Sequence, residues 1–136
     1  MTKASVFISA AESSSDLHAA QVLRELKQIY PKELESFGLG GTALQKEGLQ
    51  TWIHAREFSV GGGPLEVIGK LPKRRSLERT LEKYLYESKI DFALLVDNGE
   101  INLRLASILH FFGVPVYYYI PPKVWAWRLS RIERLK

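Results

Sequence analysis

The feature that most constrains this fold is a regular alternation between short apolar runs and longer segments with helical spacing. The run "SVFIS" is rich in β-branched and aromatic residues, and "DFALLVD" contains five apolar residues in succession. Such runs are typical of strands that are buried on both faces. Strands that alternate with helices indicate parallel pairing through helical crossovers. The expected strands are 5–9, 36–39, 49–54, 91–97 and 114–120.

Capping residues and prolines place the helices between these strands. Asp16 is in position to cap the first helix, and Gly48 is a natural C-cap for a short one. A helix can begin at Pro64, whereas Pro72 predicts a break or kink near Leu71. The sequence therefore predicts an α/β fold, a Rossmann-like parallel sheet flanked by helices. The other expected helices are 16–30, 43–47, 76–89, 101–112 and 123–136.

Composition excludes several classes of site. The 136 residues include no cysteine, so disulfides, thiolate nucleophiles and cysteine-based metal sites are excluded, and a reducing compartment is expected. The three histidines share no metal-like spacing, so we predict no metal. No apolar stretch is long enough for a secretory signal or a membrane span. The net charge of +4 suits an anionic partner without identifying one.

Two polar loops are expected at the carboxyl ends of strands, where open α/β sheets bind ligands. The loop "AAESSSD" offers backbone N–H groups and hydroxyls to an anion, or is simply a well-capped helix start. The loop "VDNGEIN" places Asp97 directly after a strand, where a carboxylate can act as a general base. Alternatively, Asp97 only holds the turn through its neighbouring amides, and the pattern alone favours this second interpretation.

The stretch "YYYIPPKVWAWR" combines aromatic bulk with positive charge. Trp125 and Trp127 point to different faces of the expected helix, so one can pack inward while the other lines a cleft. Aromatic rings suit sugars and acyl chains, and Arg128 can hold a phosphate. The alternative is a domain interface or a core pair.

The basic run "KLPKRR" follows several apolar residues and suits an anionic membrane surface. The alternative is a solvated helix end. The residues concerned are Leu65, Val67, Ile68, Leu71, Lys73, Arg74 and Arg75.

Five stretches in order resemble the lipid-A-disaccharide synthase family, inverting glycosyltransferases of the two-domain B-type architecture. The family loop G-E-x-S-G-D is similar to "AESSSD", and its glycine-rich segment is similar to "FGLGGTALQKEGL". The family segments S-V-M-G…E-V-L, D-x-P-D-F-N and Y-x-S-P-x-x-W-A-W-R correspond to "SVGGGPLEVIG", "DNGEIN" and "YIPPKVWAWR". The chain departs from the family pattern at Ala11, Ser15, Gly99, Glu100 and Pro121.

The resemblance implies a function and a division of labour. Residues 1–136 would form the N-terminal acceptor-binding domain, and a C-terminal donor-binding domain would lie outside this chain, so we expect the isolated chain to be inactive. The reaction would join UDP-2,3-diacylglucosamine to 2,3-diacylglucosamine 1-phosphate as a β-1,6 disaccharide, without cofactor or metal. Asp97 would be the catalytic base. The acceptor site would contain Glu12, Ser14, Asp16, Glu66, Asn102, Trp125, Trp127 and Arg128. The protein would be cytoplasmic, peripheral on the inner face of the cytoplasmic membrane.

Two rival functions stay open. The departures at Ala11, Ser15 and Pro121 are compatible with a non-catalytic Rossmann-like ligand-binding domain. Basic and aromatic residues also suit nucleic-acid binding, but the basic residues are scattered and no nucleic-acid-binding motif is present, so we expect no nucleic-acid partner.

Overall fold

The computed structural model describes residues 3–58, 64–97 and 99–119, with the backbone alone over 64–71. Within these residues, five parallel strands form one sheet in the order β3-β2-β1-β4-β5. The chain therefore builds one half of the sheet outward from β1, then crosses back to add β4 and β5 on the other side. The strands are β1 (Lys3–Ser9), β2 (Glu33–Gly40), β3 (Gln50–His54), β4 (Phe92–Val96) and β5 (Val116–Tyr119). The predicted Rossmann-like α/β fold is confirmed.

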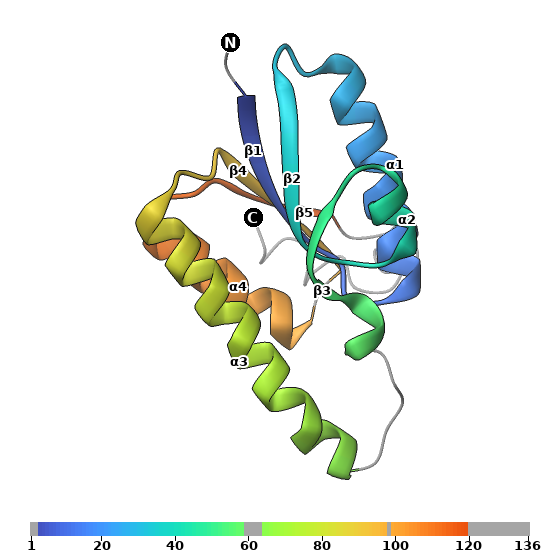
Figure 1. The fold of residues 1–136 in the computed structure, drawn as a ribbon, viewed down its shortest axis with the longest axis vertical. Helices are drawn as coiled ribbons and strands as arrows, with labels where there is room; N and C mark the ends of the chain where they lie inside the picture. Colours follow the sequence, from blue (N-terminus) through green and yellow to red (C-terminus); the bar gives the residue numbers. More distant parts are fainter. Residues whose placement is uncertain (1–2, 59–63, 98, 120–136) are drawn as a thin grey trace, which may run out of the picture.

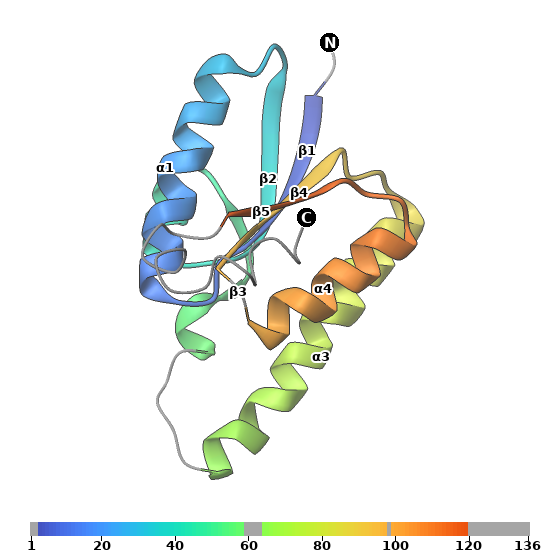
Figure 2. The ribbon, with the colours of Figure 1, turned by 180° about the vertical axis from the view of Figure 1, so that it is seen from behind.

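The helices cover both faces of the sheet, as the handedness of parallel crossovers requires. Figures 1 and 2 show α1 and α2 on one face and α3 and α4 on the other. The change of face occurs at β3, after which the chain reaches β4 on the far side of β1. The helices are α1 (Ser13–Ile29), α2 (Thr42–Lys46), α3 (Pro64–Glu87) and α4 (Glu100–Phe111), with a 3-10 helix, η1 (Ala55–Glu57), after β3.

Two apolar cores lie on the two faces of the sheet, and the central strand β1 contributes to both. Phe7 belongs to the core under α3 and α4, whereas Val6 and Ile8 belong to the core under α1. This follows from the two-residue period of a strand. On α3, Leu77 and Leu81 are fully buried, and each such burial contributes about 1.5–3 kcal/mol. The helical stripe predicted over 76–89 is therefore confirmed.

Two local expectations need correction. The helix α3 continues through Pro72 as one element, so no break occurs near Leu71, and the alternative, a kink there, stays a prediction. Asp16 does not cap α1, because the N-cap of that helix is Glu12 and the helix begins at Ser13. The run of serines extends the helix by a turn, and the Asp16 carboxylate is thereby released for a different partner.

Candidate functional site

A cavity of about 500 Å³ opens where β1 and β4 end. Its wall combines the β1–α1 loop with the start of α4, so segments about 85 residues apart in sequence meet there. Three carboxylates line it, those of Glu12, Asp97 and Glu100. The structure thus brings together three of the predicted site residues, Glu12, Asp97 and Asn102, at the edge of the sheet where we expect a ligand.

Asp97 lies at the exit of β4 in an unusual conformation. Its φ of 72° falls in the left-handed region, which Asp tolerates better than most residues. Its backbone N–H donates to the Tyr119 carbonyl at 2.8 Å, which holds it beside β5. The Ser15 hydroxyl donates to Asp97 Oδ2 at 2.9 Å, and the structure describes no other donor to this carboxylate. The side chain is therefore half-buried on the cavity wall, with one oxygen oriented by Ser15.

Asn102 supports this loop from beneath. Its side chain is 4% exposed, and its amide nitrogen donates to the carbonyls of Val96 at 3.0 Å and Asp97 at 2.9 Å. Its oxygen accepts from the Ser9 hydroxyl at 2.6 Å. Because both polar atoms of Asn102 are engaged within the fold, its clearest role is to fix the backbone that presents Asp97. Direct contact of Asn102 with an acceptor stays a prediction.

Asp16 performs a structural task that the sequence did not reveal. Its carboxylate accepts hydrogen bonds from the backbone N–H groups of Gly41, Ala43 and Leu44 at 2.8, 2.9 and 3.0 Å. It therefore caps α2, whose own N-cap residue is Gly41. A Cβ at Gly41 would lie 2.7 Å from Asp16 Oδ2, so glycine is needed for this approach. This close contact explains the last glycine of "GLGG".

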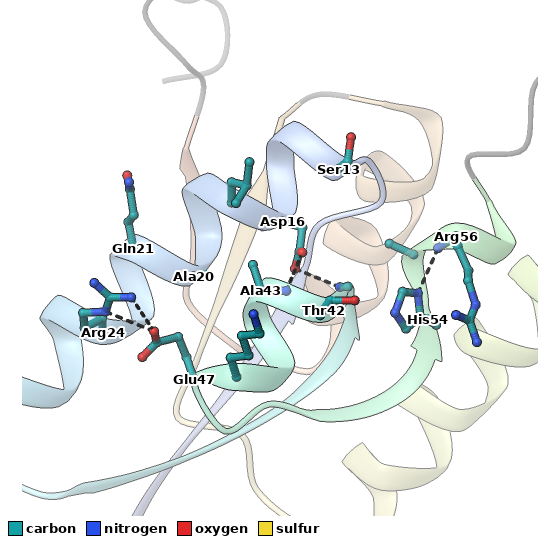
Figure 3. A pocket seen from close by; sticks show the side chains of 14 residues that line it. Ser13, Asp16, Ala20, Gln21, Arg24, Thr42, Ala43, Glu47, His54 and Arg56 are labelled. Atoms are coloured by element: carbon teal, nitrogen blue, oxygen red, sulfur yellow. Dashed lines mark hydrogen bonds and ion pairs between the residues drawn. The ribbon is translucent and has the colours of Figure 1, made fainter.

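A second cavity, of about 610 Å³, lies beside the first and is shown in Figure 3. The helix α1 forms one wall through Ser13 and Asp16, α2 forms the floor, and His54 and Arg56 line the far side. Sequence reasoning missed this site, because its polar residues come from three separate elements. The packing of α2 against α1, to which the Asp16 hydrogen bonds contribute, and the position of η1 after β3 bring them together.

An ion pair closes one end of the second cavity. Arg24 donates to Glu47 Oε2 from Nε at 3.0 Å and from Nη2 at 2.8 Å. The hydrogen bond from Arg24 holds the pKa of the Glu47 carboxyl below its usual value, and the same bond raises the pKa of Arg24. Lys27 also donates to the Glu47 carbonyl. Glu47 is therefore ionised and occupied by the adjacent cation at neutral pH.

The remaining predicted residues fall in two groups. Arg74 forms an ion pair with Glu100 at 2.8 Å, and its side chain is 22% exposed, whereas Arg75 is exposed and Lys73 lies 3.4 Å from Glu57. Ser14 is half-buried on α1 and lines neither cavity. The other predicted residues are outside the described side chains: Glu66, Leu65, Val67, Ile68, Leu71, Trp125, Trp127 and Arg128.

The described residues contain neither a cluster of metal-ligating side chains nor a membrane-spanning helix. No group of three or more acidic or histidine side chains in them is arranged to hold a metal ion. No described helix is long and apolar enough to cross a membrane.

Comparisons with known proteins agree on one family. A family profile described as "Lipid-A-disaccharide synthetase" matches residues 6–136. The chain is 41% identical over 130 residues to a lipid-A-disaccharide synthase of Anaeromyxobacter dehalogenans (strain 2CP-C), covering 96% of this chain and 33% of the relative. The corresponding protein of Myxococcus xanthus is 40% identical over 131 residues, covering 96% and 34%. That of Blochmanniella pennsylvanica is 36% identical over 129 residues, covering 95% and 33%. The chain thus spans about one third of the length of these relatives.

Proposed function

Because this chain belongs to the lipid-A-disaccharide synthetase family, we propose that it forms the acceptor-binding part of an inverting glycosyltransferase. The acceptor is 2,3-diacylglucosamine 1-phosphate, the donor is UDP-2,3-diacylglucosamine, and the product is their β-1,6 disaccharide. One observation carries the proposal: the Asp97 carboxylate lies on a cavity wall at the carboxyl edge of the sheet, oriented by the Ser15 hydroxyl. A base in this position can reach a sugar hydroxyl that enters the cavity.

The chemistry assigned to Asp97 is a proton transfer coupled to displacement. The carboxylate removes the proton of the acceptor 6-hydroxyl while that oxygen bonds to the anomeric carbon of the donor. The bond from this carbon to the diphosphate breaks, and UDP leaves with the electron pair. Attack opposite the leaving group inverts the anomeric configuration through an oxocarbenium-like transition state, as in glycoside hydrolysis. The donor would be held by the part of the relatives that this chain does not cover.

The surroundings of Asp97 suit this role. The base must point at the substrate oxygen with little freedom, and three contacts restrict it: the Tyr119 carbonyl, the Ser15 hydroxyl and the Asn102 amide. Ser15 stands where the resembled family has glycine, so its hydrogen bond is a feature of this chain. Glu12 lines the same cavity and is in position to shape the acceptor pocket.

A chimera provides the test. This chain would replace the matching 130 residues of the Anaeromyxobacter dehalogenans relative, and disaccharide formation would be followed with both lipid substrates. Asp97→Asn should lower the turnover by about 10²–10⁴-fold, the usual contribution of a general base, with acceptor binding and circular dichroism unchanged. Glu25→Gln, the same kind of change on the exposed face of α1, is the matched control.

Near-normal turnover of the Asp97→Asn chimera would remove Asp97 from the mechanism. A chimera that binds acceptor but forms no disaccharide would favour the non-catalytic ligand-binding alternative.

We also propose peripheral contact with an anionic membrane through the amino-terminal part of α3. Lys73 and Arg75 are exposed on this helix, and each basic residue near an anionic surface contributes about 1 kcal/mol. Lys73→Glu with Arg75→Glu should weaken binding to anionic liposomes, whereas Arg79→Glu with Lys83→Glu, farther along the same helix, should weaken it less. Equal binding by both double variants at low salt would argue against this contact.

A further inference from the structure

The two cavities are neighbours that share the first turn of α1 as a wall. Glu12 and Ser15 line the cavity that contains Asp97, whereas Ser13 and Asp16 line the second cavity. Both open at the carboxyl edge of the sheet, the first beyond β1 and β4 and the second beyond β2 and β3. A ligand that reaches Asp97 can therefore extend over this turn into the second cavity.

The second cavity has a surplus of available positive charge. Lys46 and Arg56 line it and are exposed, and neither has an ion-pair partner among the residues that the structure describes. Two carboxylates also line it, but each is already engaged. Asp16 accepts three backbone N–H groups, and Glu47 is paired with Arg24. Lys46 and Arg56 can therefore bind an anionic ligand, because both carboxylates that line the cavity already have other partners.

Neutral donors complete the lining. The Arg56 backbone N–H donates to His54 Nδ1 at 3.1 Å, so the neutral imidazole carries its proton on Nε2 and is a donor there. Thr42 and Ser13 add hydroxyl groups from α2 and α1 (Figure 3). Ammonium, guanidinium, imidazole and hydroxyl donors gathered in one concave site are the groups that bind phosphate oxygens.

We propose that the second cavity is a subsite for a sugar phosphate monoester, with Lys46 and Arg56 as its principal cations. The volume of about 610 Å³ far exceeds one phosphate ion and falls within the range of small-molecule sites, which favours a phosphate that arrives attached to a sugar. The assignment of the bound phosphate to the glycosyl acceptor rests on the proposed function. The binding of a sugar phosphate by the cavity is independent of the proposed function.

The experiment titrates the 136-residue chain with glucosamine 1-phosphate and with inorganic phosphate at constant ionic strength, by calorimetry and amide NMR shifts. Lys46→Gln with Arg56→Gln should weaken glucosamine 1-phosphate binding at least about tenfold, the effect of losing charge-assisted hydrogen bonds. Lys32→Gln with Lys83→Gln is the control. It removes the same charge from exposed positions before β2 and on α3, away from the cavity, and should leave the affinity within about twofold.

Each outcome decides the matter. Saturable binding that only the Lys46 and Arg56 variant weakens, with shifted amides in α2 and η1, supports the subsite. Equal weakening in both double variants, or no saturation, overturns it. Affinity for glucosamine 1-phosphate no higher than for inorganic phosphate overturns the sugar phosphate assignment. Disaccharide formation by the chimera is measured in a separate assay. An inactive chimera with intact sugar phosphate binding refutes the proposed function alone, and an active chimera without that binding refutes this inference alone.

Discussion

Replacing Asp16 by alanine should destabilise the chain strongly, because one carboxylate satisfies three backbone amides of α2. Loss of an N-cap typically costs about 1 kcal/mol. The amides of Gly41 and Leu44 are buried, and each buried donor left without an acceptor adds about 1–3 kcal/mol. The adjacent cavity can admit water to these amides, so we take the lower end of the range. The expected total is about 3 kcal/mol, a large share of the ~5–15 kcal/mol that stabilises a typical domain.

Asp16→Asn separates the cap from the charge. Its single oxygen can replace Oδ1, which accepts from Gly41 and Leu44, so only the Ala43 bond is lost. The expected cost is about 1 kcal/mol. The measurement is urea unfolding followed by far-UV circular dichroism. Glu25→Ala, on the exposed side of the same helix, serves as the control and should stay within about 0.5 kcal/mol of the parent.

Two results would refute the reasoning about Asp16. One is a loss below about 1 kcal/mol for Asp16→Ala, because a cap alone accounts for that much. The other is an equal cost for the alanine and asparagine variants, which would mean that the hydrogen bonds are not the source. Unchanged stability together with lost transfer in the chimera would instead support the acceptor-binding role predicted for Asp16.

Two further predictions concern buried polar groups. Asn102→Ala should lower the kcat of the chimera with little change in KM, because the Asn102 amide holds the backbone that presents Asp97. A raised KM with an unchanged kcat would instead indicate that Asn102 contacts the acceptor. Tyr118→Phe should raise the free energy of unfolding by about 1 kcal/mol, because the Tyr118 hydroxyl is buried without a hydrogen-bond partner among the described residues. An unfolding free energy in urea no higher than that of the parent chain would contradict this. Burial raises the pKa of Tyr118 above its ordinary value of 10.0. The folded state therefore holds this proton more tightly, and stability should fall as pH rises through 10, by less in Tyr118→Phe.

The sheet and its helices could be predicted from sequence because they depend on local periodicity. The two-residue pattern of β1 and the helical stripe of α3 each identify buried faces without knowledge of their partners. The expected boundary of β2 was short by several residues, since its first half alternates exposed and buried positions and contains two glutamates. The place of Asp97 at the end of a strand was equally visible, because parallel strands present their carboxyl ends at one edge.

The side-chain pairings of the site could not be predicted, because they join residues distant in sequence. Ser15 and Asp97 are 82 positions apart, and Ser9 and Asn102 are 93 apart. Such pairs depend on strand register and on the rotation of each helix about its axis. The Asp16 prediction failed for this reason. A polar residue before an apolar helix predicts a local cap, whereas the hydrogen-bond partner of Asp16 lies 25 residues farther along the chain.

The first turn of α1 has a consequence for how the β1–α1 loop can vary. The Ser15 hydroxyl donates to Asp97, which follows β4. The next residue, Asp16, accepts from Gly41 at the start of α2. Two consecutive side chains therefore bind partners on different sides of α1. Inserting or deleting one residue in this loop would turn the helix by about 100° relative to the sheet and break both contacts together. The loop should therefore accept changes of side chain far more readily than changes of length, and a library of single-residue insertions there should yield almost no folded chains.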